Sequence, residues 1–296
     1  MIKTNITSLR DPFVLVEGMT YYLYGSDVSI NWREDSNFSC YKNVTGRLDG
    51  EWLNIGRIVE FPQEAISNRW APEVHKYKGG YYLFATYFSD KTKHRGCVIF
   101  YSASPEGPFR EITNGQITPK EWDAIDGTLY VDETGQPWLV FVREWISTED
   151  KVGRMAIARL SDDLTHLVSE PVEIFRADSP QWAVGNITDG CFMYKTSDGQ
   201  LLMLWSNFNK DGYCVAIARS NNGKIDGEWL MDETLLFSKE ICGDADGGHG
   251  MIFKDFQGDL YLAIHSPNWA KEQVKERVVF IPIVEEKGSL RCVISH

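Results

Sequence analysis

The chain repeats one hairpin pattern five times, and this repeat limits the possible folds more than any other feature. Its clearest copy is Ile125–Val142, IDGTLYVDETGQPWLVFV, in which two runs rich in aromatic and β-branched residues flank a Glu-Thr-Gly-Gln turn. Such runs, bounded by Gly and Asp, are typical of two β-strands joined in a hairpin. A carboxylate residue, Asp126, begins the first run, and Gly127 follows it directly.

The other four copies follow the same plan, and each is followed by further strand-like runs and a polar turn. The residues that begin the five hairpins stand 55 to 63 positions apart and are Asp11, Ala71, Asp126, Asp189 and His249. A period of this length, with four strands per unit, is the signature of a β-propeller. We therefore predict an all-β, five-bladed β-propeller with four antiparallel strands per blade. It would form a single domain over residues 1–296, with blades starting near residues 11, 71, 126, 189 and 249. The alternative is a β-sandwich in which similar hairpins recur by chance.

The charge of the chain argues against two classes of partner. With 30 Lys and Arg against 42 Asp and Glu, the formal net charge is −12. Nucleic acids and anionic membranes attract clusters of basic side chains, so neither is predicted as a partner. No apolar run approaches the ~18 residues of a membrane-spanning helix. The first residues, MIKTNITSLRDPF, lack the apolar core of a signal peptide, which is expected of a cytoplasmic protein. If a leader has been removed, a periplasmic or secreted protein is expected instead, and the compartment stays open.

Propeller geometry predicts where a functional site would lie. The innermost strand of each blade lines the central channel, so the five starting residues converge at one end of the axis. The second strand runs antiparallel to the first, and its carboxyl end therefore returns to the same face. The residues expected at this rim are Asp27, Phe88, Arg143-Glu144-Trp145, Ser206-Asn207-Phe208 and His265.

Three of the five starting residues are aspartates: Asp11, Asp126 and Asp189. Carboxylates packed together shift each other's pKa values, as acid/base catalysis on sugars requires. A structural interpretation also exists, because Asp-Pro and Asp-Gly are common turn pairs and Asp side chains often bind nearby backbone.

Aromatic side chains offer flat apolar faces on which sugar rings can pack. Trp70, beside a starting residue, is the first candidate, and Trp32, Phe88 and Trp145 are candidates at the rim. The site is the preferred interpretation for Trp70, whereas the three rim residues could equally be part of the core. Three further tryptophans are assigned to packing between blades: Trp52, Trp122 and Trp229.

This arrangement resembles glycoside hydrolase family 43, whose members are five-bladed propellers that cleave arabinofuranosyl and xylosyl linkages with inversion. The resemblance covers essentially the whole chain. It rests on Arg10-Asp11-Pro12-Phe13, Trp70-Ala71-Pro72-Glu73, Ile125-Asp126-Gly127, Thr188-Asp189-Gly190 and Gly248-His249-Gly250. It implies that Asp11 is the general base, that Asp126 adjusts the pKa of the acid and orients it, and that Asp189 is the general acid.

The fourth blade departs from the family pattern, which usually has Glu in a Glu-Gly-Pro setting where this chain has Asp189-Gly190-Cys191. Asp is one methylene shorter, so either its backbone lies closer to the sugar or another carboxyl, Glu144 or Glu73, donates the proton. The resemblance also implies a hydrated calcium ion or another small cation beside His249 in the central channel. No cofactor is expected to be required.

The sequence therefore predicts an inverting glycosidase, with an exo-acting α-L-arabinofuranosidase as the leading hypothesis. Its substrates would be arabinose- or xylose-containing plant-type glycans, and its substrate-binding residues Trp70, Trp32, Phe88, Arg143, Glu144 and Trp145. An inverting pair of carboxyls stands ~6.5–9.5 Å apart, which leaves room for water. β-Xylosidase, endo-arabinanase and a sugar-binding propeller without catalysis remain alternatives. The related invertase and levansucrase clan expects Asn-Asp-Pro and Glu-Cys motifs, and the chain has neither.

Overall fold

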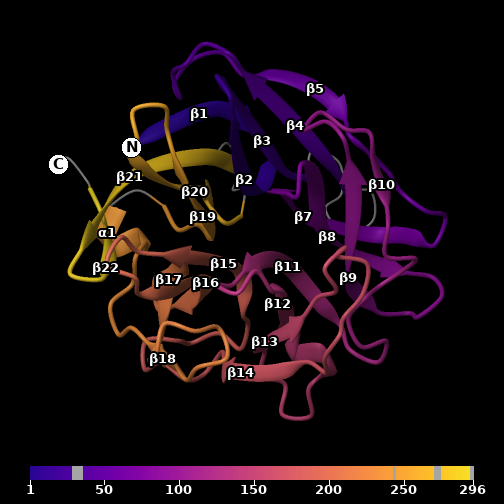
Figure 1. Cartoon of the computed structure of the whole chain (residues 1–296). Helices are drawn as coiled ribbons and strands as arrows, with labels where there is room; N and C mark the ends of the chain where they lie inside the picture. Colours follow the sequence, from indigo (N-terminus) through magenta and orange to yellow (C-terminus); the bar gives the residue numbers. More distant parts are fainter. Residues whose placement is uncertain (29–35, 243–244, 270–274, 294–296) are drawn as a thin grey trace.

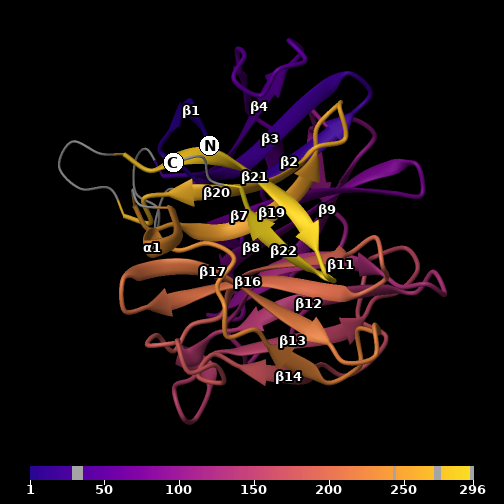
Figure 2. The ribbon, with the colours of Figure 1, turned by 90° about the vertical axis from the view of Figure 1, so that its left-hand side faces the viewer.

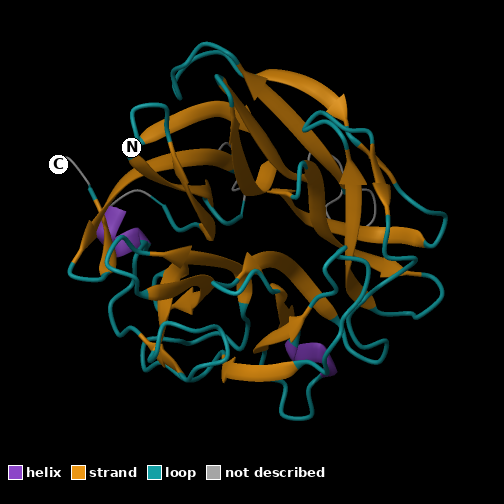
Figure 3. Ribbon diagram, viewed as in Figure 1, coloured by secondary structure: helices purple, strands orange, loops and turns teal. Residues whose placement is uncertain are grey.

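The computed structural model describes residues 1–28, 36–242, 245–269 and 275–293. Within these ranges the chain forms five β-sheets arranged around a central axis, which confirms the predicted five-bladed propeller (Figure 1). Nearly all regular structure is strand (Figure 3). The described helices are the short α1 (Lys239–Cys242) and a 3₁₀-helix at Trp145–Ser147. Neither is long or apolar enough to span a membrane.

In each blade consecutive strands pair in chain order from the axis outwards, and β6 in blade two and β1 in blade five are added out of chain order at the outer edge. Blade one holds β2 (Leu9–Glu17), β3 (Thr20–Asp27), β4 (Asn37–Asn43) and β5 (Leu53–Arg57). Blade two holds β7 (Ala65–Tyr77), β8 (Gly80–Ser89), β9 (Arg95–Ser102), β10 (Phe109–Glu111) and β6 (Val59–Glu60). Blade three holds β11 (Ala124–Val131), β12 (Pro137–Arg143), β13 (Arg154–Arg159) and β14 (Val172–Arg176). Blade four holds β15 (Asp189–Lys195), β16 (Leu201–Asn209), β17 (Gly212–Ser220) and β18 (Trp229–Met231). Blade five holds β19 (Gly248–Lys254), β20 (Leu260–Ser266), β21 (Arg277–Glu286), β22 (Ser289–Cys292) and β1 (Ile2–Thr7).

Both ends of the chain contribute to blade five. Strand β1 pairs antiparallel with β21, where Ile2 lies opposite Phe280, and β22 pairs with the distal half of the same strand. The first strand, β1, and the last described strand, β22, consequently belong to the same sheet (Figure 2). The sequence analysis began blade one at the amino terminus and did not predict β1. Strand β6, which precedes the innermost strand of blade two in the chain, pairs with β10 at the outer edge of that blade.

Apolar side chains from neighbouring blades pack against each other across the interfaces. Trp52 of blade one lies with its ring 5.8 Å from Phe280 of blade five, and Trp229 of blade four shares a buried cluster with Val140 of blade three. Both tryptophans therefore pack between blades, as predicted. Such interfaces hold the inner strands at fixed positions around the axis.

Each innermost strand contains a β-bulge at the same place, and the first bulged residue has a left-handed backbone. These bulge residues are Asp11 (φ 52°), Ala71 (51°), Asp126 (55°), Gly190 (57°) and His249 (50°). The bulge corrects the sequence alignment in blade four, because Gly190 and not Asp189 is equivalent to the other four. Matching the two Asp-Gly pairs placed Asp189 opposite Asp126, but Asp189 lies one residue before the bulge.

Gly190→Ala is expected to lower the free energy of unfolding by about 3 kcal/mol. A left-handed backbone costs an alanine roughly 1–2 kcal/mol. The added Cβ would also lie 2.8 Å from both Cα and Cγ of His249, which is an overpacking cost. Denaturant unfolding measures the loss. Ala71→Gly, at the equivalent bulge, is the matched control and should change the stability by less than about 1 kcal/mol. Equal losses in the two variants would contradict this account of the bulge.

Candidate active site

A cavity of about 690 Å³ opens at the end of the axis where the bulge residues converge. Its volume is within the range of roughly 300–1,000 Å³ that is usual for small-molecule sites. Nine predicted residues line it: Asp11, Trp70, Phe88, Asp126, Glu144, Trp145, Asp189, Phe208 and His249. The structure therefore brings together most of the residues that the sequence singled out, and it draws them from all five blades.

Two of the candidates, Arg143 and Glu73, lie outside the cavity lining. The guanidinium of Arg143 lies 4.2 Å from the ring centre of Trp122 and pairs with Glu173, so this side chain is outside the cavity lining. Glu73 is buried next to His75, with 3.0 Å between Oε2 and Nε2, and is also outside the lining. Trp32 falls outside the described residues.

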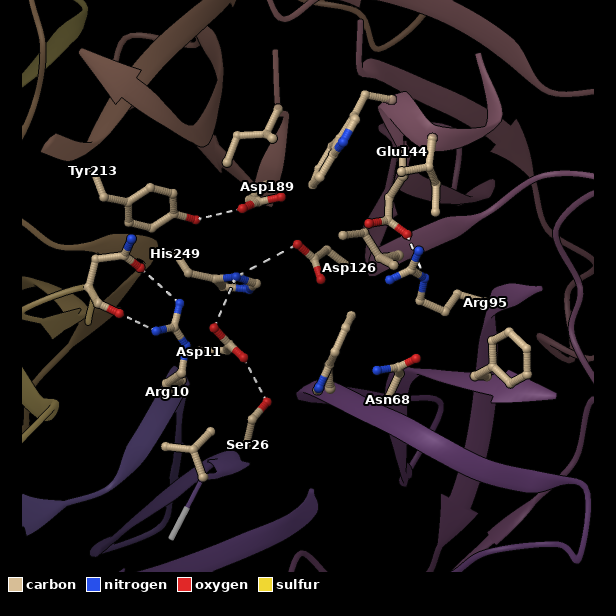
Figure 4. Close-up of a pocket in the computed structure, with 18 of the residues that line it drawn as sticks. Arg10, Asp11, Ser26, Asn68, Arg95, Asp126, Glu144, Asp189, Tyr213 and His249 are labelled. Atoms are coloured by element: carbon tan, nitrogen blue, oxygen red, sulfur yellow. Dashed lines mark hydrogen bonds and ion pairs between the residues drawn. The ribbon is translucent and has the colours of Figure 1, made fainter. Parts of the chain in front are cut away.

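Asp11 is surrounded by groups that favour its ionised form (Figure 4). The hydroxyl of Ser26 donates a hydrogen bond to Oδ2 at 2.7 Å, and Nδ1 of His249 lies 3.3 Å from Oδ1. Burial by itself would raise the pKa of Asp11, but His249, His265, Arg10 and the Ser26 hydrogen bond together outweigh it. The pKa of Asp11 consequently lies below its ordinary value, and the carboxylate is suited to accept a proton.

A neutral histidine, His265, accepts a hydrogen bond from the backbone of Asp11. His265 is fully buried, and burial together with nearby Arg10 lowers its pKa to about 3. Its Nε2 lies 3.2 Å from the side-chain oxygen of Asn268, while Nδ1 accepts the backbone N–H of Asp11 at 3.3 Å. Arg10 is held in turn by Asn268 and Glu276. This network fixes the backbone of Asp11 and keeps one permanent positive charge near its carboxylate.

Asp126 and Asp189 are shifted in the opposite direction. Oδ2 of Asp126 accepts the backbone N–H of Gly190 at 2.9 Å, and Oδ2 of Asp189 accepts the hydroxyl of Tyr213 at 3.0 Å. Burial and the negative charge of Asp11 raise the pKa of Asp126 to about 8. Burial and the negative charge of Asp126 raise the pKa of Asp189 to about 7. One cavity thus holds an ionised carboxylate beside carboxyls that retain protons near neutral pH, the pattern that separates a base from an acid.

Glu144 adds another buried carboxyl to the cavity wall. Its Oε2 lies 2.8 Å from Nε of Arg95, whose guanidinium lies 5.6 Å from the ring centre of Trp70. Burial raises the pKa of Glu144 to about 8, because the charges of Asp189, Asp123 and Asp126 add to burial and outweigh the attraction of Arg95. Glu144 is therefore a second group that could donate a proton.

Several polar residues line the cavity that were not predicted as site residues from the sequence. These are Arg10, Ser26, Asn68, Arg95, Tyr213 and Asn268. Arg95 and Tyr213 stand at or near the start of the third strand of their blades, directly across the hairpin from the rim end of the second strand. The rule that brought the end of strand two to the rim also brings the start of strand three there, and it could have found both residues.

Within the part of the chain that the structure describes, no cluster of protein ligands marks the cation site predicted beside His249. Nδ1 of His249 faces Asp11 and Asp126, at 3.3 and 3.7 Å from their oxygens. Among the described residues, three or more His, Cys, Asp or Glu side chains nowhere come together as a metal site would require. A cation in the channel stays a prediction from the family resemblance, and no catalytic step below involves one.

A comparison with protein families matches residues 5–287 to the model described as "Glycosyl hydrolases family 43". Two curated relatives match part of the chain. The extracellular exo-alpha-(1->5)-L-arabinofuranosidase ArbA of Cellvibrio japonicus is 28% identical over 56% of this chain and 47% of its own. The extracellular endo-alpha-(1->5)-L-arabinanase 1 of Bacillus subtilis is 26% identical over 46% of this chain and 44% of its own. The chain thus matches about half the length of these curated relatives.

Among solved structures, the fold is similar to that of the endo-arabinase from Bacteroides thetaiotaomicron VPI-5482. The two chains are 35% identical with a TM-score of 0.83, and the match covers 97% of this chain and 99% of the other. The similarity therefore includes every blade.

Replacing Asp189 by Asn is expected to change stability in a pH-dependent way. The pKa of Asp189 in the folded protein, about 7, lies above its ordinary value of 3.8. Its favourable contribution is therefore complete below about pH 4 and is lost as the pH rises through about 7. Asn cannot ionise, and its amide oxygen can still accept the Tyr213 hydroxyl. Asp189→Asn should match the wild type in Tm at pH 4 and exceed it at pH 8, by about 1–2 kcal/mol in stability.

The control for this experiment has the opposite sign. Hydrogen bonds from Ser161 and Thr165 lower the pKa of the exposed Asp163 to about 2. Asp163 stabilises the protein above its ordinary pKa, so Asp163→Asn should lose stability at pH 8 relative to pH 3. A Tm difference for Asp189→Asn that does not grow with pH would contradict the raised pKa.

Proposed function

The chain belongs to glycosyl hydrolase family 43, a family of inverting glycosidases, and from this membership we propose that it hydrolyses α-L-arabinofuranosyl linkages in arabinose-containing glycans. The observation that carries the proposal is the pair of opposite pKa shifts within one cavity, with Asp11 lowered and Asp189 raised. The two curated relatives are named as an arabinofuranosidase and an arabinanase, and the similar solved structure as an endo-arabinase, which supports arabinose over xylose.

In the proposed reaction, Asp11 removes a proton from a water molecule as the water oxygen bonds to the anomeric carbon. The bond between that carbon and the glycosidic oxygen breaks, and Asp189 gives its proton to the departing oxygen. Attack from the face opposite the leaving group inverts the configuration. The Tyr213 hydroxyl holds Oδ2 of Asp189, which leaves Oδ1 as the oxygen that can face the sugar. Proton exchange with solvent then restores both carboxyls.

Asp126 acts on this pair through its position. Its Oδ2 lies 3.7 Å from Nδ1 of His249, and after burial its electrostatic repulsion is the main cause that raises the pKa of Asp189. A carboxyl whose pKa lies near the working pH both holds its proton and releases it readily. The role proposed for Asp126 is therefore that of a coupled partner: the two buried carboxyls resist ionising together, so the pair retains a proton near neutral pH that Asp189 can donate.

The proposal from the sequence is an exo-acting enzyme, which releases terminal arabinose. Cleavage of internal linkages is the second candidate. The relative from C. japonicus is named as exo-acting, whereas the B. subtilis relative and the B. thetaiotaomicron structure are named as endo-acting. The likeness to the endo-acting structure extends over nearly the whole chain and favours the second candidate. The products from linear arabinan separate the two: arabinose alone indicates terminal release, and mixed oligosaccharides indicate internal cleavage.

The proton donor can be identified by comparing two substrates. Asp189→Asn should reduce hydrolysis of an arabino-oligosaccharide by about 10²–10⁴-fold. It should spare 4-nitrophenyl α-L-arabinofuranoside, because nitrophenolate leaves with little need for a proton. Asp11→Asn should lose both activities, since water attack is common to the two substrates. NMR of the first product reports whether the configuration is inverted.

Glu144→Gln is the decisive comparison for this assignment. If Glu144 donates the proton, Glu144→Gln will show the substrate-selective loss and Asp189→Asn will not. Glu111→Gln is the control, because Glu111 is also a carboxyl with a raised pKa but lies outside the cavity. Wild-type protein that is inactive on both substrates, and on linear arabinan, would contradict the proposed activity.

Tyr213→Phe should move the alkaline limb of the kcat/KM profile to higher pH. The Tyr213 hydroxyl donates to Asp189 and favours the ionised carboxylate, so its removal raises the pKa of the acid. A hydrogen bond worth about 1 kcal/mol corresponds to a shift of roughly 0.5–1 pH unit. Tyr87→Phe, which removes a hydroxyl bound to Glu64 and Glu111, is the control and should leave the limb in place. A limb that moves to lower pH in Tyr213→Phe would contradict the role of Asp189.

A further inference from the structure

The backbone N–H of each bulge residue donates a hydrogen bond across the interface to the preceding blade. We call these five contacts the seam hydrogen bonds. In four seams the acceptor is a side chain on the second strand of the preceding blade. It always belongs to the same position, the residue that lies opposite the one just before the bulge in that preceding blade. Those four seams are Ala71 N–H to Ser26 Oγ at 2.8 Å, Asp126 N–H to Thr86 Oγ1 at 3.0 Å, His249 N–H to Ser206 Oγ at 2.9 Å and Asp11 N–H to His265 Nδ1 at 3.3 Å.

The seam between blades three and four is built differently. The position equivalent to Ser26 and Thr86 is occupied by Val142, which pairs with Ile125 just before the bulge and has no acceptor atom. The N–H of Gly190 donates to Oδ2 of Asp126 at 2.9 Å in its place. A carboxyl of the active site thus supplies the acceptor that a hydroxyl or an imidazole supplies in the other seams.

We propose that Val142 is a positioning residue for Asp126: because it offers no acceptor, the Gly190 N–H binds the Asp126 carboxyl and fixes its Oδ2 at the seam. The catalytic meaning of this contact rests on the proposed function, but the contact itself does not. Gly190 directly follows Asp189, so one hydrogen bond ties the backbone beside the proposed acid to the carboxyl that sets its pKa. The distance between the two carboxyls is then determined by the blade interface.

Threonine at position 142 is the probe that the fold itself suggests. Thr86 accepts the Asp126 N–H from the equivalent place in blade two, and Val and Thr have nearly the same shape. Val142 is fully buried, so a hydroxyl there would need a hydrogen-bond partner. In the other four seams the side chain at the equivalent position accepts the N–H of the bulge residue, and in this seam that group is the N–H of Gly190. Val142→Thr should therefore compete with Asp126 for the Gly190 N–H.

A double-mutant cycle on stability tests the proposal without any substrate. Asp126→Ala should lower Tm, because it leaves the buried Gly190 N–H without an acceptor, while Ala71 shows that alanine fits this bulge backbone. Adding Val142→Thr should recover at least half of that loss. In the wild-type background the same substitution should leave Tm unchanged or lower it. This reversal of sign is the expected result.

The control is Val140→Thr, which places the same hydroxyl two residues earlier on β12, in the same blade interface but opposite Thr128 rather than opposite the residue just before the bulge. It should rescue nothing. Rescue by Val140→Thr, or an equal Tm change from Val142→Thr in both backgrounds, would overturn the proposal. If Asp126→Ala does not fold, recovery of folded protein in the Asp126→Ala, Val142→Thr double variant has the same meaning, and no recovery overturns the proposal.

Kinetics separate positioning from simple stabilisation. Val142→Thr in the otherwise wild-type enzyme should lower kcat about tenfold on an arabino-oligosaccharide and change KM less than twofold, because Asp126 is released while the cavity wall is unchanged. Val140→Thr should alter neither constant. An unchanged kcat in Val142→Thr would overturn the positioning role. If the wild type proves inactive on arabinosides, the proposed function fails and the stability cycle still decides whether Asp126 replaces the missing acceptor.

Discussion

The left-handed bulge in each innermost strand is the constraint on which the site depends. It turns one backbone N–H per blade out of its own sheet and towards the neighbouring blade, where burial requires that the N–H find an acceptor. The acceptors are a serine, a threonine, a carboxyl, a second serine and a histidine in successive seams. The same five positions deliver Asp11, Asp126 and His249 to the axis. The contacts that close the ring and the contacts that build the cavity are therefore largely the same.

This double use explains how the protein can bury several carboxyls in one place. Unpaired buried charge is costly, and the structure meets the cost in two ways. Asp11 is ionised and is compensated by Arg10, His249 and the Ser26 hydroxyl. Asp126, Asp189 and Glu144 have raised pKa values and are neutral over part of the pH range, at the expense of stability above it. The difference between the base and the acid thus follows from which carboxyl lies beside Arg10, His249 and the Ser26 hydroxyl.

The sequence allowed the fold and most of the cavity to be predicted, because hairpins repeated at a regular spacing determine both the number of blades and the end of the axis where their first residues meet. It could not reveal the bulge. Asp126-Gly127 and Asp189-Gly190 are the same dipeptide, yet the left-handed residue is Asp126 in one blade and Gly190 in the other. A one-residue shift of this kind changes no composition or periodicity, and only the pairing of Asp189 with Ser206 exposes it. Arg143 was placed at the correct edge, but its partners Trp122 and Glu173 come from loops and strands that a single repeat does not predict.

That shift also bears on the departure from the family pattern in blade four. Asp189 precedes the bulge, so its carboxyl approaches the cavity from a different backbone position than the carboxyls of Asp11 and Asp126. The bulge itself is occupied by Gly190, where any Cβ would meet His249, and its N–H is bound by Asp126. A blade that needs glycine at its bulge cannot carry a catalytic side chain there, and the preceding residue is the nearest one available. The one seam that uses a carboxyl as its acceptor is thus the seam between blades three and four, where Asp126 and the backbone beside the proposed acid, Asp189, are held together.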